Sequence, residues 1–205
     1  ITGFLVDDIT LTNCSIGTLT ADSTSVYTAT ITPSSDGLCE ISVGTNKFLD
    51  LADNLNSVAS NTFQWTFDST SPTMTITSTT TGVTSGSHTQ DATIALTFTS
   101  SEITTDFTID DIILTNGTLG VLSGSGTIYN ATFTPTAQGI STIKVLGSKF
   151  TDAPGNNNGA SNIFEWTYDV TAPTLTAAIV SNNAISTLAK PGDVVTLTMT
   201  SSETI

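Results

Sequence analysis

The sequence predicts an all-β fold built from tandem antiparallel β-sandwich repeats of about 100 residues. Apolar and polar side chains alternate over short segments, clusters of Gly, Asn, Asp, Ser and Pro separate these segments, and the whole pattern occurs twice. Alternation with a period of two indicates strands with one buried face, and no stretch shows the 3.6-residue period of a helix. A closed barrel of eight or more strands is the alternative architecture.

The internal repeat is seen by aligning the two halves of the chain. Residues 4–13 match residues 107–116 at an offset of 103, residues 27–30 match 129–132 at 102, and residues 63–68 match 164–169 at 101. Small changes of offset at a period near 100 residues are typical of loop insertions between copies of one domain. The chain is therefore expected to contain an array of domains.

The predicted strands follow in order. In residues 107–114 the apolar positions change parity across Asp110 and Asp111, and residues 4–11 repeat this change, which predicts a β-bulge in each repeat. Turns are expected at 116–117, 123–126 and 152–156, where Gly and Asn or Asp cluster. Alternating apolar residues mark further strands at Tyr129-Ala131-Phe133, Ile143-Val145, Phe164-Trp166-Tyr168, Leu175-Ala177-Ile179 and Val195-Leu197-Met199.

The boundaries of the repeats do not coincide with the two ends of the sequence. A linker after Asp68 makes residues 72–169 a complete repeat, whereas residues 1–69 lack its first two strands and residues 173–205 supply two such strands. Joining Ile205 to Ile1 would recreate the passage that connects strands inside the complete repeat. Two explanations stay open: the chain is a window of one long polypeptide, or separate subunits donate strands head to tail to copies of themselves.

The charge limits the possible partners. Four Lys and Arg face 18 Asp and Glu, which gives a net charge of −14. Nucleic acid and anionic membrane surfaces need neutralising cations, so they are excluded as partners. No apolar run approaches the roughly 20 residues that span a bilayer. Divalent cations are the natural counter-species, and solubility alone is the other explanation of the acidity.

Five motifs recur in the same order in both repeats: Asp-Asp-Ile-x-Leu-Thr-Asn, Tyr-x-Ala-Thr-x-Thr-Pro, Phe-x-Asp-x-x-x-Asn, Phe-x-Trp-Thr-Tyr/Phe-Asp and x-x-Pro-Thr. Together they resemble the bacterial Ig-like repeats of large surface adhesins and biofilm proteins, and the resemblance covers nearly the whole chain. It implies tandem immunoglobulin-like sandwiches in an extended extracellular stalk, often stiffened by calcium at the domain junctions. The binding target does not follow from such an architecture.

Acidic and amide side chains recur at one end of each repeat, and calcium takes six to eight oxygen ligands of this kind. We expect the linker Asp, a loop Asp and the Ser-Ser-Glu carboxylate to converge at each junction and bind Ca²⁺. Asp and Asn are also good turn formers, which is the alternative reading. The candidate ligands are Asp50, Asp53, Asn54, Asp68, Glu102, Asp152, Asn156, Asp169 and Glu203.

Two kinds of covalent modification are also expected. Sequons occur at Asn13, Asn116 and Asn130, although chance matches arise easily in a chain rich in Thr and Asn. Cys14 and Cys39 occur only in the first repeat, 25 residues apart. A disulfide between them is expected in an oxidising compartment, and two free buried thiols are the alternative.

The sequence offers few residues suited to catalysis. The only histidine, His88, lies in a polar segment read as a hairpin tip, without a counterpart in the other repeat. Trp65 and Trp166 share the parity of core residues rather than of a sugar-binding platform. The sequence thus predicts a non-catalytic structural repeat of an extracellular filament or adhesin stalk, on the cell surface or outside the cell. A carbohydrate- or receptor-binding module is the alternative.

Overall fold

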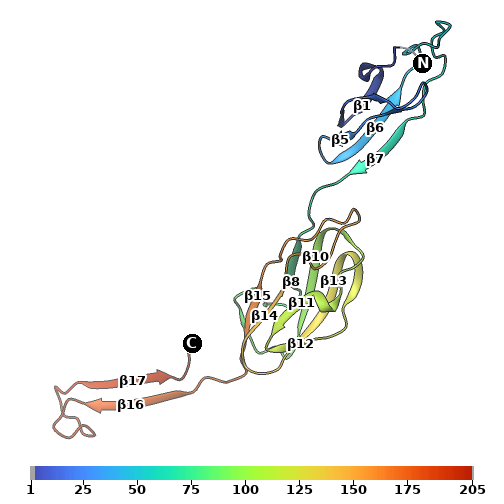
Figure 1. The fold of residues 1–205 in the computed structure, drawn as a ribbon. Coiled ribbons are helices and arrows are strands. Elements are labelled where there is room, and N and C mark those ends of the chain that lie inside the picture. The colour runs from blue at the N-terminus through green and yellow to red at the C-terminus, as the bar shows by residue number, and fades with distance from the viewer. Residues whose placement is uncertain (1–2, 205) are drawn as a thin grey trace.

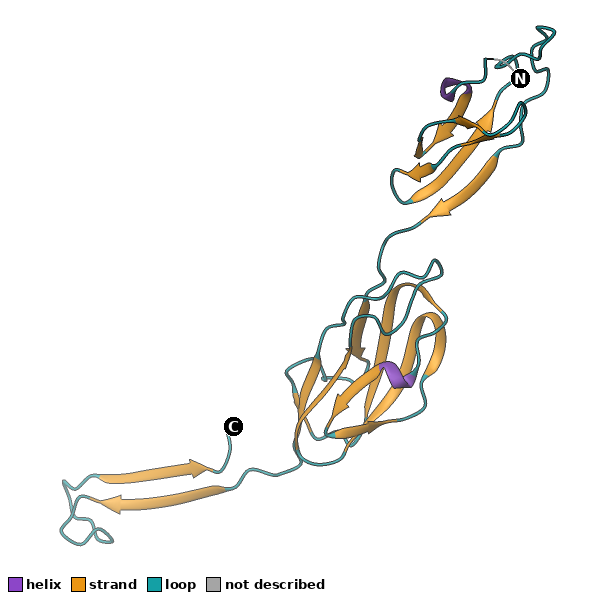
Figure 2. Ribbon diagram, in the orientation of Figure 1, coloured by secondary structure: helices purple, strands orange, loops and turns teal. Residues whose placement is uncertain are grey.

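A computed structural model describes residues 3–204, so Ile1, Thr2 and Ile205, and with them the expected joint between the two ends, lie outside the described residues. The described chain forms two β domains and a separate β-hairpin, arranged one after another (Figures 1 and 2). Its only helical elements are two short 3-10 turns, and no helix of this part is long and apolar enough to cross a membrane. The predicted all-β class is confirmed.

The second repeat is a complete sandwich of two four-stranded sheets, not a closed barrel. All strand pairs are antiparallel except that of β9 with β15, which is parallel. The first sheet has the order β12 (Gly117–Leu119), β13 (Ser123–Pro135), β10 (Ile94–Thr104) and β8 (Met74–Ser78). The second has the order β11 (Ile112–Thr115), β14 (Gly139–Val145), β15 (Phe164–Tyr168) and β9 (His88–Thr89).

The core of this repeat lies between the two sheets, because the inward positions of the alternating strands are apolar. Trp166 on β15 is fully buried, and its ring meets that of Phe133 on β13 edge to face, with centroids 4.6 Å apart. Phe107 makes a similar edge contact with Tyr129 at 5.1 Å. Aromatic pairs in this geometry contribute about 0.5–1.5 kcal/mol beyond the burial of their surface.

The first repeat has counterparts of β11, β14 and β15 in one sheet and of β12 and β13 opposite it, but none of β8 and β10 among its described residues. Its main sheet has the order β1 (Ile9–Thr12), β6 (Gly37–Val43) and β7 (Phe63–Phe67). Facing strands form two small pairs, β2 (Cys14–Ile16) with β5 (Ile31–Pro33) and β3 (Thr20–Ala21) with β4 (Tyr27–Thr28). The hairpin at the other end consists of β16 (Leu175–Ser181) and β17 (Val195–Ser201).

The expected β-bulges are wrong. The parity change at Asp110 and Asp111 is produced by a 3-10 turn, η2 (Ile109–Asp111), and η1 (Val6–Asp8) takes its place in the first repeat. The Asp111 carboxylate accepts a hydrogen bond from the Thr108 amide at 2.8 Å, which closes the turn. A turn that ends in a capping carboxylate changes the inward parity as a bulge would, so the two are alike in sequence.

The turn expected at residues 123–126 is present, although these residues carry the first part of β13. Gly124 and Gly126 adopt positive φ angles of 115° and 69°, and the chain folds back so that Gly124 lies beside Tyr129. At Gly124 a Cβ would lie 2.2 Å from the Ile128 carbonyl oxygen, so glycine serves close backbone approach there. The exposed His88, expected at a hairpin tip, lies on β9 beside Thr167.

The expected disulfide between Cys14 and Cys39 is not formed, and both residues are free thiols. Asn13, at a φ angle of 54°, turns the chain between them, so Cys14 pairs with Pro33 in one sheet while Cys39 pairs with Trp65 in the other. The Cys39 thiol donates to the Asn13 carbonyl oxygen at 3.3 Å. Burial raises the pKa of the Cys39 thiol, which keeps it in the neutral form.

The residue at the same position of the second repeat explains the packing of each cysteine. Ser141 occupies the place of Cys39 and likewise donates to a carbonyl oxygen, that of Asn116, at 3.5 Å. Gly117 occupies the place of Cys14, and a Cβ there would lie 2.1 Å from the ring of Phe133. The first repeat has Ile31 where the second has Phe133. A larger residue on β2 is therefore matched by a smaller one on the neighbouring strand.

We expect Gly117→Ala to destabilise the complete repeat by about 1–3 kcal/mol, the usual cost of overpacking. Phe133→Ile alone should also destabilise it by leaving a cavity, and the double variant should lose less than the sum of the single losses. Urea unfolding followed by Trp fluorescence measures all three. Gly159→Ala is the matched control, because its Cβ would meet no atom within 4 Å. Additive losses in the double variant would contradict the packing argument.

Candidate cation site at the junction of the repeats

The linker between the repeats is held by hydrogen bonds from the first repeat. Asp36 precedes β6, and its carboxylate accepts hydrogen bonds from the Ser69 amide at 2.8 Å and from the Ser69 hydroxyl at 2.7 Å. Its second oxygen accepts from the Thr70 hydroxyl at 2.5 Å. These bonds lower the pKa of Asp36, led by the one from Thr70. Asp68 accepts from the Thr70 amide at 2.9 Å, which turns the chain into the second repeat.

A loop of the second repeat meets the linker from the other side. Asp152 accepts hydrogen bonds from the amides of Gly155 at 2.8 Å and Asn156 at 2.7 Å, and from the Asn156 side chain at 2.9 Å. The same Asn156 Nδ2 donates to the Asp68 backbone oxygen at 3.1 Å. In the first repeat, Asp50 accepts in the same way from Ala52 and Asn54. The loop thus has the same local structure in both repeats, and in each it is stiffened by its own aspartate.

Three of the nine candidate ligands converge at this junction. Asp68 of the linker, Glu102 of β10 and Asp152 of the loop each offer a carboxylate oxygen, and these oxygens lie within 4.8 Å of one another. Asp152 is buried, and the other two are half-buried. Burial raises the pKa of Glu102, and the neighbouring charges of Asp68 and Asp152 raise it further. Three crowded carboxylates with hard oxygen donors fit a divalent cation such as Ca²⁺.

Asn156 lies at the same junction, where its side-chain nitrogen donates to both Asp68 and Asp152. The remaining candidate ligands lie elsewhere in the described chain. Asp53 is an exposed turn residue with a φ angle of 64°, in the place where the second repeat has Gly155. The side-chain amide of Asn54 braces its own loop. Asp169 and Glu203 lie around the hairpin in the places that Asp68 and Glu102 take in the complete repeat, and Asp50 takes the place of Asp152.

Two functional carboxylates were missed from the sequence. Asp36 latches the linker, and Asp106 accepts hydrogen bonds from the Thr151 amide at 3.0 Å and the Thr104 hydroxyl at 2.7 Å. Asp36 is followed by Gly37, so it looks like an ordinary turn residue, and its counterpart in the second repeat is Gln138. Gln138 accepts from the Thr171 amide and hydroxyl at 3.1 Å and 2.9 Å. A polar residue stands at the same position before each linker, and this recurrence is the sequence signal that could have revealed the contact with the linker.

The sequon residues differ in what their side chains do. The amide nitrogen of Asn13 donates to the Ser35 carbonyl at 2.8 Å, and that of Asn116 donates to the Ala137 carbonyl at 2.9 Å. Both residues have positive φ angles and hold the chain where it passes between sheets. Asn130 lies exposed on β13, where its side-chain oxygen accepts from the Thr97 hydroxyl at 2.9 Å. Glycosylation of these residues stays a prediction. At Asn13 and Asn116, the side-chain nitrogen that would carry the glycan already donates a hydrogen bond within the fold.

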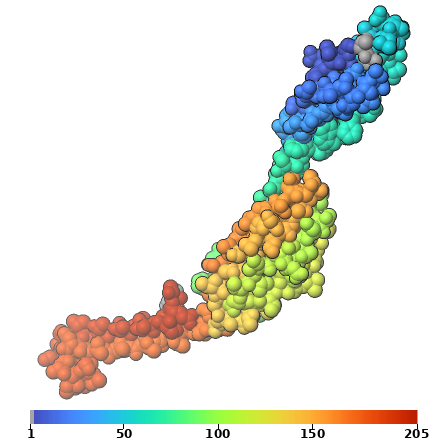
Figure 3. All heavy atoms as spheres, viewed as in Figure 1, coloured from blue at the N-terminus to red at the C-terminus, as the bar shows by residue number. Residues whose placement is uncertain are grey.

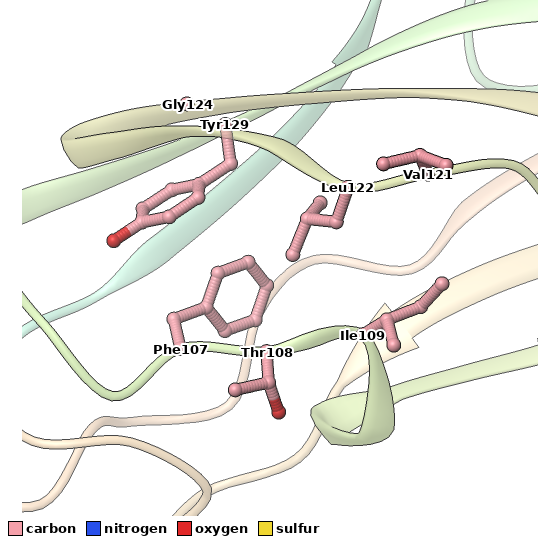
Figure 4. A pocket seen from close by; sticks show the side chains of 7 residues that line it. All are labelled: Phe107, Thr108, Ile109, Val121, Leu122, Gly124 and Tyr129. Carbon is pink, nitrogen blue, oxygen red and sulfur yellow. The ribbon is translucent and has the colours of Figure 1, made fainter.

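A hollow of about 490 Å³ opens between the 3-10 turn and the start of β13 (Figure 4). Its lining is mainly apolar. The hydroxyl of Tyr129 donates to the Thr104 carbonyl at 3.0 Å, away from the hollow's other side chains. The hollow therefore offers an apolar surface without a reactive group. Its lining residues are Phe107, Thr108, Ile109, Val121, Leu122, Gly124 and Tyr129.

The sandwich fold and the repeated loop define a class of protein, an array of immunoglobulin-like domains. Comparison with known families gives the family: residues 1–67 and 68–168 each match the bacterial Ig-like domain. The chain therefore belongs to the bacterial Ig-like domain family, as its five repeated motifs indicated.

Comparison with individual proteins adds one solved structure. InvD of Yersinia pseudotuberculosis is similar over 83% of this chain and 51% of its own, with 20% sequence identity and a TM-score of 0.36. This chain thus spans about half the length of the InvD chain that it matches. A search of curated proteins found no match.

We expect millimolar Ca²⁺ to raise the melting temperature of the complete repeat, by about 4–8 °C for each kcal/mol of binding free energy. Glu102→Gln should raise the melting temperature in a chelator, because it removes like-charge repulsion, and should abolish the response to Ca²⁺. Scanning calorimetry with Ca²⁺ and with EDTA measures both effects.

The matched control is Asp110→Asn, which removes another exposed carboxylate of the same repeat. This variant should keep the full response to Ca²⁺. Equal melting temperatures of the parent chain in Ca²⁺ and EDTA would contradict the site.

Proposed function

We propose that this chain is a non-catalytic structural stretch of an extracellular or cell-surface protein, in which stacked repeats form a stalk or a filament. The tandem bacterial Ig-like architecture supports this role, because sandwiches joined end to end hold distant parts of a protein apart. The strongly acidic charge supports it too, since a net charge of −14 keeps a long array soluble. The one histidine is exposed on a two-residue strand, away from the acidic junction residues in sequence.

The observation that carries the proposal is the grip on the linker from both repeats. Asp36 of the first repeat binds the backbone and hydroxyls of the linker, while Asn156 of the second binds the Asp68 carbonyl. Linkers between independent domains are usually mobile and polar. A linker fixed on both sides instead transmits the orientation of one repeat to the next, which is the property that a stalk needs.

Calcium belongs to this proposal as a brace of the junction. Ca²⁺ would offset most of the negative charge of the three carboxylates and take their oxygens as ligands. Asp68 comes from the linker, whereas Glu102 and Asp152 come from the body of the second repeat. Binding of one cation by all three would therefore tie the linker to the repeat that follows it.

We expect small-angle X-ray scattering of the monomeric chain to show a narrower distribution of shapes in Ca²⁺ than in EDTA. The double variant Asp36→Ala/Asn156→Ala should broaden the distribution in EDTA, because both sides of the grip are lost. Asp22→Ala, in the turn between β3 and β4, is the control and should scatter like the parent chain. Identical scattering of the double variant and the parent would argue against a fixed linker.

Negative-stain electron microscopy of the natural material tests the role itself. Extended stalks or uniform filaments with a repeat of one or two domains are the expected result, with softening on addition of a chelator. Compact, discrete particles would contradict the structural role and favour a binding module.

A further inference from the structure

One buried asparagine of the second repeat closes the loop that meets the linker. Asn158 is 3% exposed, and its side chain joins the two ends of this loop. Its oxygen accepts hydrogen bonds from the amides of Lys149 at 2.6 Å and Phe150 at 2.9 Å. Its nitrogen donates to the carbonyl oxygens of Leu146 at 2.9 Å and Gly159 at 2.6 Å. All four hydrogen-bonding positions of the amide group are therefore used inside the loop.

The backbone around Asn158 fixes the loop to the rest of the repeat. The Asn158 amide donates to the Phe150 carbonyl at 3.0 Å, and the Gly159 amide donates to the Pro72 carbonyl at 2.9 Å. Figure 3 shows this part of the chain, in orange, at the end of the complete repeat that meets the linker. Because Asp152 lies inside the closed loop, its place in the carboxylate cluster depends on the Asn158 side chain.

Asn158 is followed by glycine, and this pair of residues is chemically reactive. A backbone nitrogen can attack the side-chain carbon of the asparagine before it, and glycine allows this most readily because it has no side chain. The fold does not require glycine at 159, where φ lies outside the left-handed region and an added Cβ would meet no atom within 4 Å. In the first repeat, Asn56 makes four such hydrogen bonds but is followed by Ser57.

We propose that Asn158 and Gly159 form a deamidation site that the folded loop keeps closed and that local opening of the loop exposes. In the folded loop, the attacking nitrogen of Gly159 donates to Pro72, and the leaving nitrogen of Asn158 donates to two carbonyl oxygens. Neither nitrogen is free to react. Opening of the loop breaks these bonds, and the two residues then react as they would in an unfolded chain.

The reaction needs only water as a co-reactant. The Gly159 nitrogen gives up its proton to hydroxide and bonds to Cγ of Asn158, and the bond from Cγ to Nδ2 breaks with release of ammonia. Water then adds to one of the two carbonyl carbons of the cyclic imide and opens the ring. An aspartate or an isoaspartate is left at position 158. The net change replaces the side-chain NH₂ by OH, which is ionised at neutral pH.

The product cannot rebuild the closed loop. A carboxylate only accepts hydrogen bonds, so the carbonyl oxygens of Leu146 and Gly159 would lose their donor. The new charge would also be buried in a loop that already holds Asp152, and an unpaired buried charge is costly. An opening that lasts long enough to react therefore becomes permanent. The effect on the cation rests on the proposed function, whereas the chemistry at Asn158 does not.

Peptide mapping of the 205-residue chain by mass spectrometry tests the site. Aspartate and isoaspartate should form at position 158 at least about tenfold faster in urea than in native buffer, because the reaction follows the fraction of open loop. Gly159→Ala should suppress the product in urea, since the added methyl group hinders the attack. Asn56 of the same molecule is the internal control, and in urea it should react more slowly than Asn158.

The variant Asn158→Asp makes the aspartate product directly. It should lower the melting temperature of the complete repeat in EDTA by at least about 4–8 °C, the shift that matches the loss of one net hydrogen bond in a domain of this size. It should also weaken the response to Ca²⁺, because Asp152 is no longer held. Asn157→Asp puts the same charge on the exposed neighbouring residue and should melt like the parent chain.

The proposal would be overturned by an absence of product at Asn158 in urea, by equal rates in urea and native buffer, or by equal rates in the parent and Gly159→Ala. It would also be overturned by Asn158→Asp and Asn157→Asp melting alike. If Asn158→Asp does not fold, the peptide maps of the parent and of Gly159→Ala still decide. A parent chain that does not respond to Ca²⁺ would contradict the cation brace of the proposed function and leave the products at Asn158 unchanged.

Discussion

A strand with one apolar face has to place that face against a second sheet, and every part of this molecule follows from that constraint. In the complete repeat, β13 places Phe133 against Trp166 of the opposite sheet, and both residues are fully buried. The first repeat has the same alternation of residues, but only the small pairs β2 with β5 and β3 with β4 face its main sheet. Its apolar residues are accordingly more exposed, as Phe63 is at 60% where its counterpart Phe164 is at 4%.

A different constraint acts at the junction, which is the repulsion between neighbouring carboxylates. Hydrogen bonds hold two of the three residues Asp68, Glu102 and Asp152 in place: the Thr70 amide fixes Asp68, and the loop amides fix Asp152. The Asn156 side chain donates to both Asp68 and Asp152 and so joins the linker to the loop. Burial adds to their mutual repulsion and raises the pKa of Glu102. Bringing three carboxylates together therefore costs the fold stability, and the proposed cation would recover it only with the linker in its place.

The sequence predicted the strands and the convergence of the three acids because both depend on periodicity. The period of two locates the inward residues, and the period near 100 residues places Asp68, Glu102 and Asp152 at one end of a sandwich. Local geometry was less accessible. A 3-10 turn at Ile109–Asp111 changes parity as a bulge does, so the alternation of residues alone does not distinguish the two. Asp36 was missed because its partners, Ser69 and Thr70, are distant in sequence and polar like their neighbours.

The two cysteines show why residue type alone misled. Their spacing fits a bridge between neighbouring strands, but Cys14 pairs with Pro33 in one sheet and Cys39 with Trp65 in the other. Each thiol instead donates to a backbone carbonyl, Cys14 to that of Glu40 and Cys39 to that of Asn13. Comparison of the two repeats explains the role of each cysteine separately. Cys39 makes the hydrogen bond that Ser141 makes, and Cys14 fills space that the ring of Phe133 occupies beside Gly117. Divergence between the copies is thus compensated across a strand pair, which lets the sandwich persist while its individual core residues change.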